Sequence, residues 1–229
     1  MERHALLFLL VCCAGFYVHA TDVRVQRLNR FQEKYNNSRS DIIFLLDVSG
    51  SVSNSGFRDE KEFISSLLSK ISVQAIATRV SVITFGKSVR ENIDYIDATG
   101  ALAGEMNKCT FNKEFTRINH RHGPATNMAG ALKKARDILK SAENRGLKRD
   151  NVNTVIVMLT DGWWNEGGEP YTIAGELRDR TKFDAEIISV GIGYSLASQL
   201  KRVSGSDGNV VTARNFADFG GLATRIRGG

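Results

Sequence analysis

From residue 41 onward, the apolar residues of the chain follow two alternating patterns. Short continuous runs rich in β-branched residues are typical of strands buried on both faces of a sheet. A run of this kind predicts a strand at residues 42–46, and further strands are predicted at 80–85, 89–95, 154–159, 186–190 and 209–212. The second and third of these strands are separated only by a short segment that contains Gly86-Lys87, so we expect them to form a hairpin.

Between these runs, apolar residues recur at spacings of three and four, which is typical of amphipathic helices. The first predicted helix carries Phe57, Phe63 and Leu67, and Ser53 or Asn54 can cap it. Further helices are predicted around residues 132–142, 173–177 and 196–203, and a last one follows the cap residue Asn215. Strands that alternate with helices predict parallel crossover connections. The predicted fold class is therefore α/β, a doubly wound, mostly parallel sheet flanked by helices.

The first 20 residues have the pattern of a secretory signal peptide. Arg3 precedes an apolar run over residues 5–16, and Val18-His19-Ala20 fits a small-residue cleavage site. The apolar run is shorter than the roughly 20 residues that a membrane-spanning helix needs. We therefore expect residues 1–20 to be a signal peptide and the protein to be secreted, extracellular and without a transmembrane segment.

Residues 21–40 are polar and mixed in charge, and we interpret them as an N-terminal linker. Leu28, Phe31 and Tyr35 have helical spacing, enough for one short amphipathic turn. Asn36 begins the sequon Asn36-Asn37-Ser38 and is the expected glycosylation site. Residues 41–227 then form the predicted α/β domain, and a chain of 229 residues suits one large domain of this kind.

Cleavage of the signal peptide would remove Cys12 and Cys13 and leave Cys109 as the remaining cysteine. A lone cysteine in a secreted protein is either a buried thiol or a bridge to another chain. The sequence leaves both alternatives open.

The net charge of +6 is compatible with anionic partners such as sulfated glycans. Acidic residues interleave the basic ones, however, and this pattern favours an ordinary solvated face. We expect no nucleic-acid partner for a secreted chain. The basic residues concerned lie in and around the helix predicted at 132–142: Arg117, His120, Arg121, His122, Lys133, Lys134, Arg136, Lys140, Arg145, Lys148 and Arg149.

Polar residues follow two of the predicted buried strands directly. Asp47-Val48-Ser49-Gly50-Ser51 comes after the first, and Thr160-Asp161-Gly162 follows the strand at 154–159. In an open parallel sheet, ligands bind beyond the carboxyl ends of the strands, where the strand order reverses. Oxygen ligands suit a hard cation such as Mg²⁺, with Mn²⁺ or Ca²⁺ as alternatives, whereas zinc prefers His and Cys. These segments therefore predict a divalent metal site.

At these residues the sequence resembles the von Willebrand factor type A family, which includes integrin inserted domains, matrilins and collagen VI modules. The metal ion-dependent adhesion site of the family reads Asp-x-Ser-x-Ser, then a threonine before a helix, then Thr-Asp-Gly after a buried strand. Asp47, Ser49 and Ser51 match the first element, Thr126 the second and Asp161 the third. The resemblance covers residues 41–226. It implies that Ser49, Ser51 and Thr126 contact the metal directly or through water, and that the two aspartates act largely through water.

Two features near this motif need separate interpretation. Met128 stands where many relatives carry a second threonine, outside the five matched positions. Trp163 and Trp164 follow Asp161 and should rim the metal, with one ring packed inward and the other facing solvent. An exposed tryptophan beside a metal would be a good anchor for a partner. The alternative is that both rings only cover the edge of the site.

The resemblance implies a secreted adhesion or extracellular-matrix module whose metal binds an exposed Asp or Glu of a protein partner. The alternative is a structural matrix component in which the metal only stabilises the fold. A metal-assisted hydrolase would need a general base or nucleophile near the ion. The sequence offers no Ser-His-Asp set, Cys-His pair or second cluster of carboxylates for a second metal, so we do not expect an enzyme.

Overall fold

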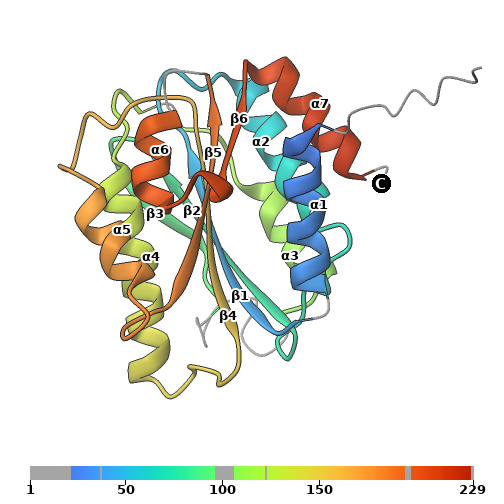
Figure 1. Cartoon of the computed structure of the whole chain (residues 1–229), viewed down its shortest axis with the longest axis vertical. Helices are drawn as coiled ribbons and strands as arrows, with labels where there is room; N and C mark the ends of the chain where they lie inside the picture. Colours follow the sequence, from blue (N-terminus) through green and yellow to red (C-terminus); the bar gives the residue numbers. More distant parts are fainter. Residues whose placement is uncertain (1–21, 37, 96–105, 122, 194–196, 228–229) are drawn as a thin grey trace, which may run out of the picture.

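The computed structural model describes residues 22–36, 38–95, 106–121, 123–193 and 197–227. A six-stranded sheet runs through it in the order β3-β2-β1-β4-β5-β6 (Figure 1). Its strands are β1 (Ser40–Asp47), β2 (Thr78–Phe85), β3 (Val89–Ile93), β4 (Asn153–Thr160), β5 (Ala185–Ile192) and β6 (Val210–Ala213). Only the β2–β3 pair is antiparallel, which confirms both the hairpin and the mostly parallel sheet.

The strand order reverses between β1 and β4. From β1 the chain proceeds outward through β2 and β3, and it then returns to the other side of β1 to add β4, β5 and β6. The adjacent carboxyl ends of β1 and β4 therefore form the switch point at which ligands of such sheets bind. Asp47 ends β1 and Thr160 ends β4, as the sequence predicted.

Helices cover both faces of the sheet (Figure 1). One layer consists of α4 (Met128–Asn144), α5 (Tyr171–Arg178) and α6 (Ala197–Ser204). The other consists of α1 (Val23–Asn36), α2 (Asn54–Leu67), α3 (Lys108–Arg117) and α7 (Phe216–Arg227). A short 3-10 helix, η2 (Asp207–Asn209), precedes β6. This arrangement confirms the doubly wound α/β fold.

Side-chain caps define where several helices begin. Ser53 accepts a hydrogen bond from the amide of Gly56 at the start of α2, as one of the two predicted caps. Asn127 accepts from the amide of Gly130 in the first turn of α4. Asn215 accepts from the amide of Asp218 at the start of α7. Each bond satisfies an amide that has no partner within its own helix.

The interpretation of residues 21–40 as a linker was wrong in one respect. Residues 23–36 form a helix of 14 residues, α1, and not a single turn. Leu28, Phe31 and Tyr35 face inward as their spacing predicted, and Val25 and Gln32 are buried beside them. The helix forms because this apolar stripe covers part of the sheet that α2 and α7 leave open.

Two further differences concern the middle of the chain. Helix α3 was not predicted, and its apolar residues Phe111 and Phe115 stack in the core with ring centroids 5.2 Å apart. The strand predicted at 89–95 ends at Ile93. The predicted signal peptide lies outside the described residues. Within the described part, no helix has the length and apolar character needed to cross a membrane.

Candidate metal centre

Three loops meet at the carboxyl ends of β1 and β4. The loop after β1 contacts the loop before α4 through a bridge between Ser49 and Gly123, whose amide donates to the carbonyl of Val48 at 3.1 Å. A Cβ at Gly123 would lie 2.9 Å from the backbone nitrogen of Lys87, so no larger residue fits there without moving the backbone. The close approach of these backbones brings the side chains of the two loops together.

Asp47 is the more deeply buried of the two carboxylates at the candidate site. One carboxylate oxygen accepts a hydrogen bond from the amide of Ser49 at 2.8 Å, and the other accepts from the hydroxyl of Thr160 at 2.6 Å. Its side chain is fully buried, and burial raises the pKa of Asp47 to about 6, although both hydrogen bonds act in the opposite direction. A cation beside it would favour the charged carboxylate.

Ser49, Ser51 and Asp161 form a continuous polar chain above Asp47. The hydroxyl oxygens of Ser49 and Ser51 lie 3.1 Å apart, and Ser51 donates to a carboxylate oxygen of Asp161 at 2.6 Å. Burial also raises the pKa of Asp161, and its bond from Ser51 counters this. The loops after β1 and β4 are thus joined directly through side chains that the sequence singled out.

Thr126 completes the set from the loop before α4. A Cβ at Gly162 would lie 3.6 Å from the hydroxyl oxygen of Ser51 and 3.7 Å from that of Thr126, so both hydroxyls border the same small space. Asn165 holds Thr126 in place. Its side chain accepts from the amide of Thr126 at 2.9 Å, and its own amide donates to the carbonyl of Thr126 at 3.2 Å. Sequence reasoning missed Asn165, because a single Asn in a polar loop gives no signal of its own.

The donor set fits a hard divalent cation. Three hydroxyls and two carboxylates supply oxygen ligands only, as Mg²⁺ prefers, and leave room for water in its shell. In the ranges that the structure describes, no three His, Cys, Asp or Glu side chains gather to hold an ion. A metal at this place must therefore depend on the hydroxyls of Ser49, Ser51 and Thr126 as well as on the two aspartates.

Glu60 is a third acidic residue whose charge interacts with those of Asp47 and Asp161, and nothing in the sequence indicated its burial. In the structure its side chain on α2 is completely buried, and neither carboxylate oxygen has a hydrogen-bond partner. Burial, followed by the charges of Asp47 and Asp161, raises the pKa of Glu60 well above its usual value.

The two tryptophans differ in solvent exposure, as predicted. Trp163 is 50% exposed, whereas Trp164 is partly buried against the hydrophobic core. Met128, by contrast, is fully buried in the first turn of α4. It therefore belongs to the core and does not replace a polar ligand at the site.

Most of the basic residues around α4 have acidic partners. Five of the seven in and after this helix form ion pairs, with Glu91, Glu176, Asp137, Glu143 or Asp41: Lys134, Arg136, Lys140, Lys148 and Arg149. Arg117 closes α3 and pairs with Glu114. Arg149 also belongs to a largely buried cluster with Asp41 and Arg79 at the opposite end of the sheet. This pairing favours the solvated face over a glycan-binding surface.

Cys109 and Asn36 are both accessible. The thiol of Cys109 is exposed near the start of α3, which excludes the buried thiol of the two alternatives and leaves the bridge to another chain as a prediction. Asn36 is exposed at the last position of α1. An exposed position agrees with what glycosylation requires, and modification of Asn36 stays a prediction.

An open sheet with polar loops at its switch point defines a doubly wound α/β domain with a candidate metal site at that point. The chain belongs to the von Willebrand factor type A domain family, which it matches over residues 41–225. It is 33% identical over 207 residues to rat "Sushi, von Willebrand factor type A, EGF and pentraxin domain-containing protein 1", covering 88% of this chain and 5% of that protein. It is 27% identical to the mouse collagen alpha-5(VI) chain over 192 residues, covering 82% of this chain and 6% of that protein. The chain thus spans a small fraction of these relatives.

Solved structures share the fold. Proximal thread matrix protein 1 from the mussel byssus, in a structure described as having a zinc-occupied MIDAS motif, superimposes with a TM-score of 0.71. The sequence identity is 20%, over 83% of this chain and 47% of the mussel chain. MIDAS is the abbreviation of the metal ion-dependent adhesion site.

Proposed function

We propose that this domain is a secreted adhesion or extracellular-matrix module that uses a divalent cation to bind an acidic group of a protein partner. The observation that carries the proposal is the convergence of Asp47, Ser49, Ser51, Thr126 and Asp161 from three loops at one switch point. The similarity to a collagen chain and to a byssus matrix protein supports an extracellular, non-enzymatic role.

The chemistry follows from the charge of the ligand set. Two carboxylates against a doubly charged ion leave little surplus negative charge, so the bound ion stays able to accept a further carboxylate. Mg²⁺ is the proposed ion, with Mn²⁺ or Ca²⁺ as alternatives. Trp163, half exposed beside Asp161, supplies an apolar surface on which the partner's flanking residues can pack.

The test is a calorimetric titration of the purified protein with Mg²⁺, Mn²⁺ and Ca²⁺. We expect wild type to bind one ion and Asp161→Asn to bind at least about tenfold more weakly, because a charged ligand is lost. The matched control is Asp150→Asn, which removes the same charge from an exposed position at the other end of the sheet and should bind like wild type. Equal affinities for the two variants would refute the site.

Partner binding is tested separately with an immobilised collagen and with a peptide that carries an exposed Glu. Binding that EDTA abolishes and Mg²⁺ restores would support adhesion, and Trp163→Ala should weaken it. Binding that is insensitive to EDTA would contradict the proposal.

The exposed thiol of Cys109 favours a second candidate, a structural matrix component. In this role the metal only stabilises the fold, and Cys109 or basic residues make the contacts. Mg²⁺ would then raise the melting temperature without changing adhesion. The two candidates therefore differ in the effect of EDTA on partner binding.

A further inference from the structure

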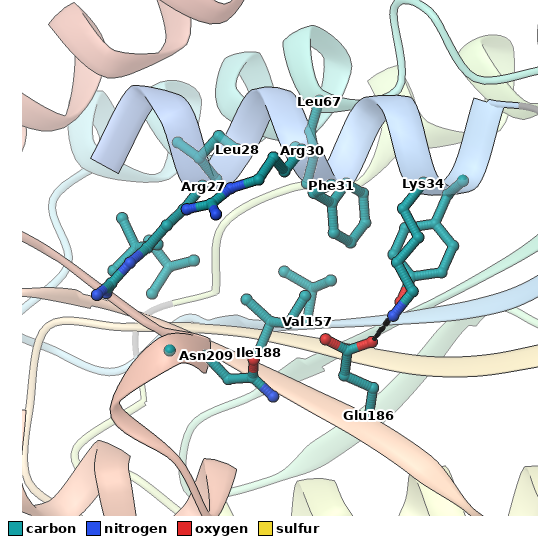
Figure 2. Close-up of a pocket in the computed structure, with 14 residues that line it drawn as sticks. Arg27, Leu28, Arg30, Phe31, Lys34, Leu67, Val157, Glu186, Ile188 and Asn209 are labelled. Carbon is teal, nitrogen blue, oxygen red and sulfur yellow. Dashed lines mark hydrogen bonds and ion pairs between the residues drawn. The ribbon is translucent and has the colours of Figure 1, made fainter. Parts of the chain in front are cut away.

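A cavity of about 330 Å³ lies between α1 and the sheet, away from the residues of the metal site (Figure 2). Its volume falls at the lower end of the roughly 300 to 1,000 Å³ that small-molecule pockets occupy. The roof is α1, the floor is formed by β4, β5 and β6, and η2 closes one end. The roof therefore belongs to a helix that precedes the family domain matched over residues 41–225.

The floor of the cavity is apolar and incompletely covered. Val157 and Val190 are buried, whereas Ile188, in the middle of β5, is only half-buried. Residues in the middle of a parallel sheet are normally covered on both faces. At Ile188, α1 approaches the sheet but leaves a hollow, with Leu28 and Phe31 as its apolar wall.

The rim of the cavity is basic. Arg27, Arg30 and Lys34 line it from α1, and Glu186 is its carboxylate. Figure 2 shows Lys34 and Glu186 together at one end, with Val157 and Ile188 toward the middle of the view. Glu186 accepts from both Lys34 and the hydroxyl of Tyr35, so its charge is already compensated.

No acidic side chain among the described residues balances the positive charges of Arg27 and Arg30. Arg27 donates to the backbone carbonyls of Asp207 and Val210, which orient its guanidinium but carry no net charge. Arg30 is exposed. Neither arginine forms an ion pair within the described part of the chain. Arginine side chains bind carboxylates and sulfates in a forked geometry, so this end of the cavity favours an anionic head group.

We propose that this cavity binds a single-chain amphiphilic anion, a carboxylate of the fatty-acid class. The alkyl chain lies over Ile188 against Leu28 and Phe31, and the carboxylate pairs with Arg27 and Arg30. This combination of an apolar floor and an unbalanced positive rim distinguishes the cavity from a simple packing defect, whose lining would be apolar throughout. The site goes beyond the proposed adhesion function and needs no metal.

The first experiment measures binding of decanoate to the purified protein by calorimetry, with decanol and acetate as probes that each lack one half of the ligand. We expect saturable binding of one decanoate per chain, and at least about tenfold weaker binding of decanol and acetate. Binding in EDTA should equal binding in Mg²⁺, so the outcome is independent of the metal site. Decanol that binds as tightly as decanoate would overturn the proposal.

Two variants locate the binding. Arg30→Gln should weaken decanoate binding about tenfold, whereas Arg58→Gln, at an exposed arginine of α2 away from the cavity, should leave it unchanged. Ile188→Trp should abolish binding by filling the cavity, with circular dichroism and the melting temperature as checks on folding. Decanoate binding that survives both Arg30→Gln and Ile188→Trp would place the ligand elsewhere and refute the site.

Discussion

Glu60 adds a buried, ionisable carboxyl group close enough to the candidate metal site to interact with its two aspartates. It is fully buried on α2 without a hydrogen-bond partner, and the carboxyl groups of Asp47 and Asp161 both act on its charge. Three carboxyl groups thus influence one another where only two belong to the candidate site. A buried carboxylate without a partner is costly, and the folded protein therefore favours the protonated form of Glu60.

This leads to a prediction about stability in EDTA. Burial raises the pKa of Glu60 in the folded protein above its ordinary value of 4.5. Its ionisation therefore does not lower the free energy of unfolding below about pH 4.5, and lowers it increasingly as the pH rises from there toward the folded-state pKa. Glu60→Gln removes the charge, and we expect it to stabilise the metal-free protein near pH 8 and to do so by a smaller amount near pH 5. Urea unfolding at the two pH values measures this.

Glu33→Gln, at an exposed position of α1, is the matched control and should change stability little at either pH. If Glu60→Gln were neutral near pH 8, or destabilising by the same amount at both pH values, ionisation of Glu60 would not limit stability.

At the scale of the element, the strands and most of the helices were predictable because their local signals agree with the final packing. The run at 155–159 is continuous and apolar, and Ser53 and Asn215 are standard helix caps. Helix α1 was underestimated because its buried residues are separated by charged ones, so its helical character depends on the sheet face that it covers. In α3, the pair Phe111 and Phe115 was a usable signal that we did not use.

The candidate site likewise contains residues with a local sequence signal and residues whose role depends on packing. Four of its five candidate positions, Asp47, Ser49, Ser51 and Asp161, were predictable from the ends of two strands, because parallel strands bring their carboxyl ends to one edge. Thr126 follows helix α3 rather than a strand and was assigned only through the resemblance to the family motif. The support from Asn165 and the burial of Glu60 were not predictable, because both depend on how a loop and a helix pack in three dimensions.

If α1 is an integral part of the domain, truncating its buried face must reduce stability. Leu28 is 2% exposed, and we expect Leu28→Ala to lower the free energy of unfolding by about 2 to 4 kcal/mol. Val23, on the same helix, is 56% exposed, and Val23→Ala should change it by less than about 0.5 kcal/mol. Urea denaturation compares the two, and equal small effects would restore the interpretation of residues 21–40 as a linker.

At the scale of the whole molecule, the accessible features lie on different elements. The candidate metal site is at the carboxyl ends of β1 and β4, the cavity lies under α1, and Cys109 is exposed near the start of α3. Separate positions would allow a cation, an amphiphile and a second chain to bind without competing for the same side chains.

The exposure of Cys109 predicts covalent self-association under oxidising conditions. We expect non-reducing electrophoresis of the oxidised protein to show a dimer that reductant converts to monomer, because an exposed thiol can reach a second chain. Cys109→Ser should remain monomeric and keep the wild-type melting temperature. A wild-type protein that stays monomeric after oxidation would contradict this prediction and weaken the structural alternative.

Ion pairs connect helix α7 to helix α1 and to Asp22, which precedes α1. Arg24 of α1 pairs with Asp218 of α7 at 2.6 Å and also donates to the carbonyl of Thr212 in β6, and Arg225 of α7 pairs with Asp22 at 3.2 Å. The two helices lie side by side (Figure 1). A pulling force applied between residues 22 and 227 would therefore load these ion pairs before the strands of the sheet. These contacts would then break first, while the strands that carry the candidate metal site stay paired.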